Sequence, residues 1–237
     1  MMATIEKIRI FGDSILKGVL YDKENDKYVA MENPPIEDLI KTYHLQIHNN
    51  SLFGCTVQKG ENILHKAMNN GLSCDTAVLE YGGNDCDFDW AAIAEHPEKN
   101  HFPKTPLKKF TKTLEDMIVS LKKQKVNVIL MTLPPIDAKR YFAHICRKGL
   151  EANSILSWLK GDIQTIERFQ ELYSLSINTI AAKTNTTLID IRSAFLERRD
   201  CASLLCEDGI HPNYQGHLLI ASIFSQHLQL QKAASWN

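Results

Sequence analysis

The chain lacks an excess of charge of either sign. Its 237 residues include 27 lysines and arginines and 28 aspartates and glutamates, which gives a net charge of -1. A nucleic acid or an anionic membrane normally attracts a basic surface, so we expect neither as a partner. The sequence also lacks an apolar run approaching the roughly 20 residues needed to span a bilayer. Its first residues lack the apolar core of a signal peptide, which predicts a cytoplasmic location.

Patterns typical of metal and disulfide frameworks are missing as well. The six cysteines contain no Cys-x-x-Cys pair, so they suggest neither a zinc ribbon nor a disulfide framework. Residues 85–90 alternate acidic and other side chains like the start of an EF-hand loop. Trp90 stands where that loop needs glycine, however, and His96 stands where it needs glutamate. We therefore expect no metal and no other cofactor.

No internal repeat, low-complexity tract or linker divides the sequence, so we expect one domain over residues 1–237. Short apolar runs alternate with amphipathic segments, which favours βα units and a parallel sheet. The expected strands are Ile5–Phe11, Leu45–His48, Thr76–Tyr81, Val126–Thr132 and Thr187–Ile191. The expected helices are Pro35–Tyr43, Glu61–Asn70, Pro106–Lys123, Ile163–Ala182 and Pro212–Leu230, with Pro212 in a first helical turn.

Two short motifs at opposite ends of the chain carry groups that react together. Gly12-Asp13-Ser14 follows the first apolar run, and Asp208-Gly209-Ile210-His211 precedes the last helix. A serine hydroxyl is a weak nucleophile at neutral pH and needs an imidazole base, which a carboxylate orients in turn. Either motif alone occurs by chance, and Ser14 taken alone is explained better as a helix N-cap. Their combination indicates a serine hydrolase.

The chain resembles the SGNH subgroup of the GDSL esterase and lipase family, whose four sequence blocks occur here in order. Ser14 matches the family serine, Gly54 the glycine, Asn84 the asparagine and His211 the histidine, while Asp208 completes the triad. The resemblance implies that Ser14 attacks the ester, that His211 transfers the proton and that Asp208 orients the imidazole. It also implies an oxyanion hole made by the backbone amides of Ser14 and Gly54 and the side chain of Asn84.

The resemblance implies a fold as well. The expected architecture is a three-layer α/β/α sandwich, flavodoxin-like, with a five-stranded parallel sheet in the order 2-1-3-4-5. Ile15 replaces the leucine of the family name, and both are aliphatic. The sequence contains no Gly-x-Ser-x-Gly nucleophile elbow, which disfavours an α/β-hydrolase. Ser14, Gly54 and Asn84 each follow an expected strand, at the edge where open α/β sheets bind ligands.

The predicted activity is hydrolysis of small or medium carboxylic esters, such as O-acetylated sugars or small metabolites, through a covalent acyl-enzyme. Lysophospholipids and acyl thioesters are alternatives within the same family. Residues 85–105 and 134–160 are long segments on which specificity normally depends, and residues 150–159 are expected to form a short lid helix. Their aromatic side chains fit either a substrate pocket or a small additional core; they are Phe88, Trp90, Phe102, Tyr141, Phe142 and Trp158.

Two alternatives belong to other classes of protein. A metal-dependent phosphoesterase would use Asp13, Asn84, Asp208 and His211 as ligands, although the opening Asp-x-His element is absent from the first expected strand. A protein that binds carbohydrate or lipid without catalysis would keep the fold and leave the reactive groups idle. The sequence does not predict the oligomeric state.

Overall fold

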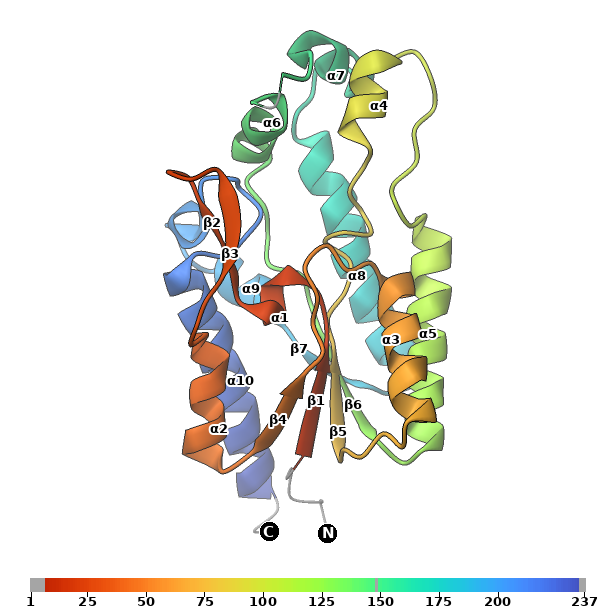
Figure 1. The fold of residues 1–237 in the computed structure, drawn as a ribbon, viewed down its shortest axis with the longest axis vertical. Coiled ribbons are helices and arrows are strands. Elements are labelled where there is room, and N and C mark those ends of the chain that lie inside the picture. Colours follow the sequence, from red (N-terminus) through yellow and green to blue (C-terminus); the bar gives the residue numbers. More distant parts are fainter. Residues whose placement is uncertain (1–6, 148, 235–237) are drawn as a thin grey trace.

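The computed structural model describes residues 7–147 and 149–234, and a five-stranded parallel sheet lies at its centre (Figure 1). The strands of this sheet are β1 (Lys7–Phe11), β4 (Gln46–Asn49), β5 (Thr76–Leu79), β6 (Asn127–Met131) and β7 (Thr187–Ile189). Their spatial order is β4-β1-β5-β6-β7. This confirms the expected order 2-1-3-4-5. The first two residues of the expected first strand, 5 and 6, lie outside the described residues.

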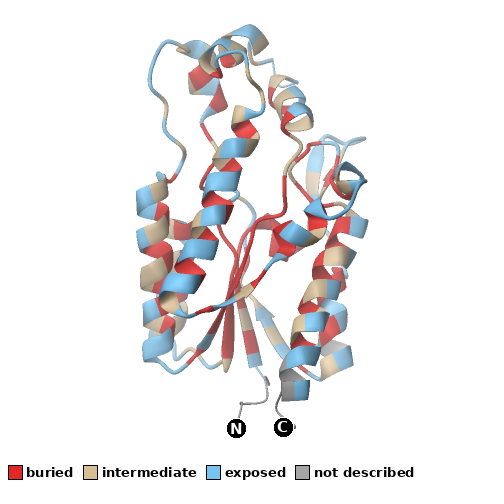
Figure 2. Cartoon of the chain, turned by 180° about the vertical axis from the view of Figure 1, so that it is seen from behind, coloured by how far each residue is buried: buried red, intermediate tan, exposed pale blue. Residues whose placement is uncertain are grey.

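The strands form because their apolar side chains alternate between two buried faces. In β6, Val128 and Leu130 join the core on one face, whereas Ile129 and Met131 join the core on the other. Successive side chains of a strand point to opposite sides, so a continuous apolar run suits a sheet covered on both faces. Figure 2 shows the strands as largely buried between helices.

Helices cover both faces of the sheet and complete the expected three-layer sandwich (Figure 1). One face is covered by α3 (Val57–Asn69), α5 (Leu107–Lys123) and α8 (Thr165–Thr184). The other is covered by η1 (Pro35–Glu37), α2 (Asp38–Tyr43), α9 (Ile191–Leu196), η2 (Cys201–Leu204) and α10 (Tyr214–Ala234). Among the described residues, no helix combines the length and apolar character needed to cross a membrane.

Pro212 is not in a first helical turn, so that part of the expectation is wrong. It forms an isolated antiparallel bridge with Leu205, and α10 begins at Tyr214. The side chain of Asn213 accepts the backbone N–H of Gly216 at 3.1 Å, which caps the helix two residues later than expected. The last expected strand is also too long, since β7 ends at Ile189 and Asp190 caps α9.

Residues that follow β1 form a small hairpin that is absent from the expected elements. After the short helix α1 (Ser14–Lys17), strands β2 (Val19–Asp22) and β3 (Lys27–Ala30) pair antiparallel. The hairpin stands apart from the central sheet and lies beyond the carboxyl end of β1 (Figure 1). It therefore adjoins the residues expected to be reactive.

Three short helices form a cap beyond the carboxyl edge of the sheet (Figure 1). We define the cap as α4 (Trp90–Glu95), α6 (Ala138–Cys146) and α7 (Ala152–Trp158), packed with the start of α8 around their own apolar cluster. Helix α7 confirms the short helix expected within residues 150–159. Aromatic contacts connect its parts, with the Phe88 ring 5.0 Å from Trp158 and 4.9 Å from Phe169 between centroids. Movement of the cap as a lid stays a prediction.

Candidate active site

Ser14 lies in the turn where β1 passes into α1. The strand ends at Phe11, and Asp13 caps the helix by accepting the backbone N–H of Ile15 on Oδ1 at 2.9 Å. Ser14 is the first residue of α1, a position whose N–H has no acceptor inside the helix. The Ser14 side chain is buried, and its Oγ is 2.9 Å from Nε2 of His211. The serine therefore touches a basic nitrogen and keeps a free backbone donor beside it.

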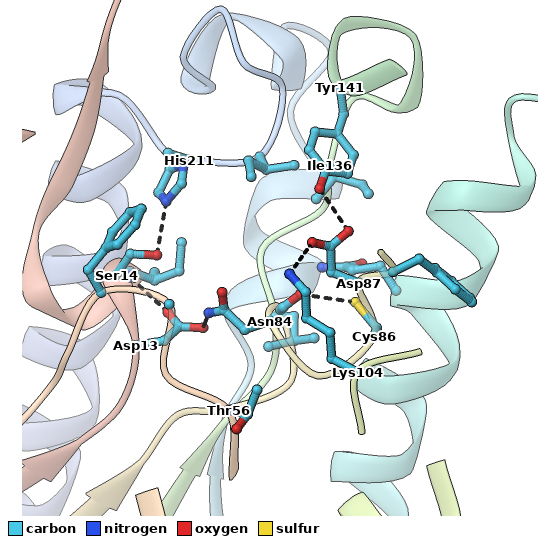
Figure 3. A pocket seen from close by; sticks show the side chains of 18 of the residues that line it. Asp13, Ser14, Thr56, Asn84, Cys86, Asp87, Lys104, Ile136, Tyr141 and His211 are labelled. Carbon is cyan, nitrogen blue, oxygen red and sulfur yellow. Dashed lines mark hydrogen bonds and ion pairs between the residues drawn. The ribbon is translucent and has the colours of Figure 1, made fainter. Parts of the chain in front are cut away.

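Asp208 holds His211 from the opposite side of the ring. His211 Nδ1 donates to Asp208 Oδ2 at 2.6 Å, which leaves Nε2 to accept the Ser14 hydroxyl. Asp208 is fully buried, and its Oδ1 accepts the backbone N–H groups of Ile210 and His211 at 3.2 Å each. These bonds fix the loop and the imidazole together. The structure thus brings Ser14, His211 and Asp208 into one hydrogen-bonded line. Figure 3 shows the contact between Ser14 and His211.

The loop that carries this pair requires glycine at position 209. Gly209 has φ +78°, and a Cβ there would come within 2.7 Å of the Asp137 carbonyl and the Arg140 side chain. The same loop is tied to the cap, because Asp137 N–H donates to the Gly209 carbonyl at 2.8 Å. The start of α6 therefore supports the position of His211.

The expected oxyanion residues, Gly54 and Asn84, line the same cavity as Ser14. Gly54 follows β4 in a turn with φ +65°, in the left-handed region that favours glycine. Asn84 follows β5, and its Nδ2 donates to Asp13 Oδ2 at 2.9 Å (Figure 3). One N–H of the carboxamide is thereby occupied and the amide plane is fixed. The second N–H of Nδ2 stays available for an oxyanion.

A second carboxylate lies beneath Asp13 and was not recognised from the sequence. Glu80 is fully buried, and its Oε2 accepts the backbone N–H of Asp13 at 3.1 Å. Burial, with the nearby charge of Asp13, raises the pKa of Glu80 well above its usual range. Burial also raises the pKa of Asp13, and the N–H of Ile15 and the amide of Asn84 oppose that shift. Of the two carboxyls, Glu80 therefore has the more strongly raised pKa.

Two aromatic side chains flank His211. The Tyr28 ring, from the β2–β3 hairpin, lies 4.9 Å from the imidazole between centroids, and Phe53 is stacked 6.3 Å away. The Tyr28 hydroxyl is 3.2 Å from Nε2 of His144 in α6, which links the hairpin to the cap. No sequence motif identifies Tyr28, because its proximity to His211 arises from tertiary structure. Phe53 is adjacent to Gly54 in the second block and could have been noticed there.

A cavity of about 510 Å³ opens between the sheet edge and the cap. Ser14, Asn84 and His211 line one part of it (Figure 3). Aliphatic side chains line another part; they include Leu133, Pro134, Ile136, Ile145, Leu150 and Ile166. Such a mixture of apolar wall and few polar groups is typical of small-molecule sites.

The aromatic residues of the cap have different positions. Phe88, Trp90 and Tyr141 line the cavity, whereas Phe142 and Trp158 pack within the cap cluster. Phe102 is 74% exposed, and it belongs neither to the cavity lining nor to the cap cluster. The alternatives left open by the sequence, pocket or additional core, therefore both occur.

His217 and Asp89 also lie near the site, and each makes a hydrogen bond that supports the fold. His217 lies on α10, as expected, with Nε2 3.4 Å from the Val19 carbonyl, and burial lowers its pKa to about 4. Asp89 caps α4 by accepting the N–H of Ala92.

Within residues 7–147 and 149–234, no group of three or more His, Cys, Asp or Glu side chains is arranged to hold a metal ion. The six cysteines are free thiols.

Comparison with known proteins adds independent findings. Residues 10–219 match the profile of the GDSL-like lipase/acylhydrolase family. A lipase/acylhydrolase from Enterococcus faecalis has a similar structure, with TM-score 0.65 and 22% identity over 94% of this chain and 95% of that one. A catalytic mutant of an acetylxylan esterase from Geobacillus stearothermophilus has TM-score 0.64 and 20% identity over 94% of each chain. No curated protein sequence gives a significant match. At these identities the two structures show the shared fold.

Proposed function

Because this chain belongs to the GDSL-like lipase/acylhydrolase family and is thereby a carboxylic-ester hydrolase, we propose that it cleaves esters with Ser14 as the nucleophile. The observation that carries the proposal is the continuous hydrogen-bonded line from Ser14 through His211 to Asp208, with distances of 2.9 and 2.6 Å. Each contact has the direction that the chemistry needs. The hydroxyl faces the basic nitrogen, and the carboxylate holds the other nitrogen protonated.

In the proposed reaction, Ser14 Oγ attacks the ester carbonyl while His211 Nε2 takes its proton. The charge that develops on the carbonyl oxygen is stabilised by the N–H groups of Ser14 and Gly54 and by the Asn84 amide. His211 then gives the proton to the departing alcohol, which leaves an acyl-enzyme on Ser14. Water, deprotonated by His211, releases the acid and restores the serine.

The proposed substrates are esters of short- to medium-chain acids, such as O-acetylated sugars or small metabolite esters. The volume of the cavity, about 510 Å³, and its aliphatic wall support an acyl group of this size. The structural similarity to an acetylxylan esterase is compatible with a sugar ester. Lysophospholipids and acyl thioesters would use the same three side chains, and the aliphatic wall favours testing them as the second substrate class.

A fluorophosphonate probe tests the nucleophile. We expect the probe to add its mass to the wild-type protein and not to Ser14→Ala, with Ser157→Ala, exposed on α7, as the labelled control. The same samples should hydrolyse p-nitrophenyl acetate or octanoate only when Ser14 is present. Hydrolysis by Ser14→Ala at the wild-type rate would refute the proposal.

A chelator separates this mechanism from a metal-dependent one. We expect ester hydrolysis to be unaffected by EDTA. Activity that EDTA abolishes and a divalent ion restores would favour the phosphoesterase alternative. Tight binding of a sugar or lipid without turnover of any ester would favour a binding protein instead.

A further inference from the structure

A polar cluster lines the cavity on the side away from Ser14 and His211 (Figure 3). At its centre is Asp87, whose side chain is 19% exposed. Asp87 Oδ1 accepts the indole N–H of Trp90 and the hydroxyl of Tyr141, each at 2.8 Å. Its Oδ2 accepts the Lys104 ammonium at 2.7 Å. The carboxylate is thus satisfied by three donors, and the reaction proposed above uses none of these residues.

The cluster fixes the ammonium group of Lys104 in one position. The backbone N–H of Lys104 donates to the Asp87 carbonyl at 2.8 Å, so the main chain and the side chain of Lys104 are both attached to Asp87. A lysine ammonium has three N–H donors, and Asp87 takes one of them. The Lys104 side chain is 46% exposed and lines the cavity, so its other donors are accessible to a molecule bound there. A preorganised donor loses less conformational entropy when it binds a ligand.

The rest of the cavity indicates which part of an ester would meet this donor. The wall formed by Leu133, Ile136 and Ile166 is aliphatic and suits an acyl chain. An ion pair is a poor partner for such a chain, because the charged groups would lose their hydration without a new hydrogen bond. Oxygen atoms of the alcohol portion would restore that bond. Asp87 and Lys104 together carry no net charge, so a neutral hydroxyl fits the pair better than a phosphate does.

From this geometry we propose that Lys104 is a specificity-determining residue, which donates a hydrogen bond to a hydroxyl oxygen on the alcohol portion of the ester. Asp87 acts through Lys104 as a positioning residue, and Tyr141 and Trp90 hold Asp87. The inference rests on the proposed ester hydrolysis and specifies its substrate class as esters of neutral, hydroxyl-bearing alcohols.

Two esters with the same acyl group and the same carbon skeleton test the inference. Glycerol 1-monobutyrate carries two hydroxyls on its alcohol portion, and propyl butyrate carries none. We expect Lys104→Met to lower the ratio of kcat/KM for monobutyrate to that for propyl butyrate about tenfold or more, the size of one charge-assisted hydrogen bond. The loss should appear chiefly in KM, because the contact is made equally in the ground and transition states. Lys104→Arg should recover part of the ratio.

Lys99→Met is the matched control, since Lys99 is exposed in the same loop and does not line the cavity. It should leave both esters at their wild-type rates. An equal loss for both esters in Lys104→Met, with no change of ratio, would mean that Lys104 only holds its loop and would overturn the inference. A wild-type preference for a butyryl glycerol phosphate that Lys104→Met abolishes would overturn the neutral-alcohol class. If the wild type hydrolyses no ester at all, the proposed function fails first.

Discussion

Asp13 connects the expected nucleophile to the expected oxyanion hole. One of its oxygens caps α1 through the N–H of Ile15, and the other accepts the Asn84 amide at 2.9 Å. The group that orients Asn84 is therefore the immediate neighbour of Ser14. The position of Asp13 next to the serine in the motif thus has a physical reason. Asp13 holds the Asn84 amide in place relative to Ser14.

Replacing this carboxylate by its amide should lower turnover. In Asp13→Asn, the new side chain still accepts the Ile15 N–H through its oxygen, but its NH₂ group then faces the NH₂ group of Asn84. Two donors repel, so Asn84 must rotate away from its present plane. We expect kcat for p-nitrophenyl acetate to fall about 10- to 100-fold, less than the roughly 10²–10³ lost when an oxyanion donor is deleted. KM should change little.

Asp89→Asn is the control for this substitution, because Asp89 caps α4 in the same manner and does not line the cavity. It should keep the wild-type kcat. An Asp13→Asn protein with full kcat and a wild-type circular dichroism spectrum would contradict the role assigned to Asp13.

At the scale of the elements, the start of α3 is determined by a residue from another loop. The first residue of the helix, Val57, donates its backbone N–H to the buried Asp85 carboxylate at 3.0 and 3.1 Å. Asp85 directly follows Asn84, so the same bond joins the Gly54 turn to the Asn84 loop. Burial raises the pKa of Asp85 to about 7. A carboxyl with this pKa makes the stability of both loops depend on pH.

The direction of that dependence follows from proton linkage. The folded pKa of Asp85, about 7, is above the ordinary aspartate value of 3.8, so its contribution to stability is full below pH 4 and is lost as the pH rises through about 7. The contribution of Asp85 to the free energy of unfolding should therefore fall between about pH 4 and pH 7. Asp85→Asn should reduce this slope, by at most about 1.4 kcal/mol per pH unit. Urea unfolding at several pH values measures the free energy of unfolding and hence this slope.

The pKa values of Glu80 and Asp13 shift in the same direction as that of Asp85, and the pKa of His217 shifts in the opposite direction, so the variant should keep a slope of its own. The difference between the two proteins isolates Asp85. Asp116→Asn, on α5 with a side chain 48% exposed, is the control and should keep the wild-type slope. Parallel slopes for wild type and Asp85→Asn would refute the prediction.

The elements also show what the sequence could predict. Residues 76–79 of β5 are buried without a break, and the short run Ala77-Val78-Leu79 predicts a strand buried on both faces from the sequence alone. The start of α3 was expected at Glu61, four residues late, because the acceptor that begins the helix comes from a distant loop. The β2–β3 hairpin has a charged connection at residues 23–26 and only a weak apolar pattern, which is typical of a loop.

Some residues of the candidate site could likewise be predicted from the sequence, and others could not. Ser14, Gly54, Asn84, Asp208 and His211 were found because each lies in a short motif with recognisable chemistry. Tyr28, Glu80 and Lys104 were not found, because nothing near them in the sequence marks them as functional. Tertiary structure alone brings them to the cavity.

For the whole molecule, the cavity lies at the contact between two separately packed regions. The sheet and its helices hold the reactive side chains, whereas the cap has its own apolar cluster and supplies most of the aliphatic wall. The sheet and its helices therefore carry the reaction, and the cap selects the length of the acyl chain. A change in the cap wall should alter the preferred substrate without disturbing the line from Ser14 to Asp208.

Ile136→Trp tests this separation. Ile136 is half-buried in the cavity wall where the chain enters the cap, and the larger ring would fill space available to an acyl chain. Each buried methylene is worth about 0.8 kcal/mol, so excluding two of them lowers binding more than about tenfold. We expect kcat/KM for p-nitrophenyl octanoate to fall at least that much relative to acetate. Lys139→Trp, exposed on α6, should leave the ratio unchanged. An equal loss on both esters would mean that the cap also maintains the reactive groups, and the assignment of chain-length selection to the cap would then be wrong.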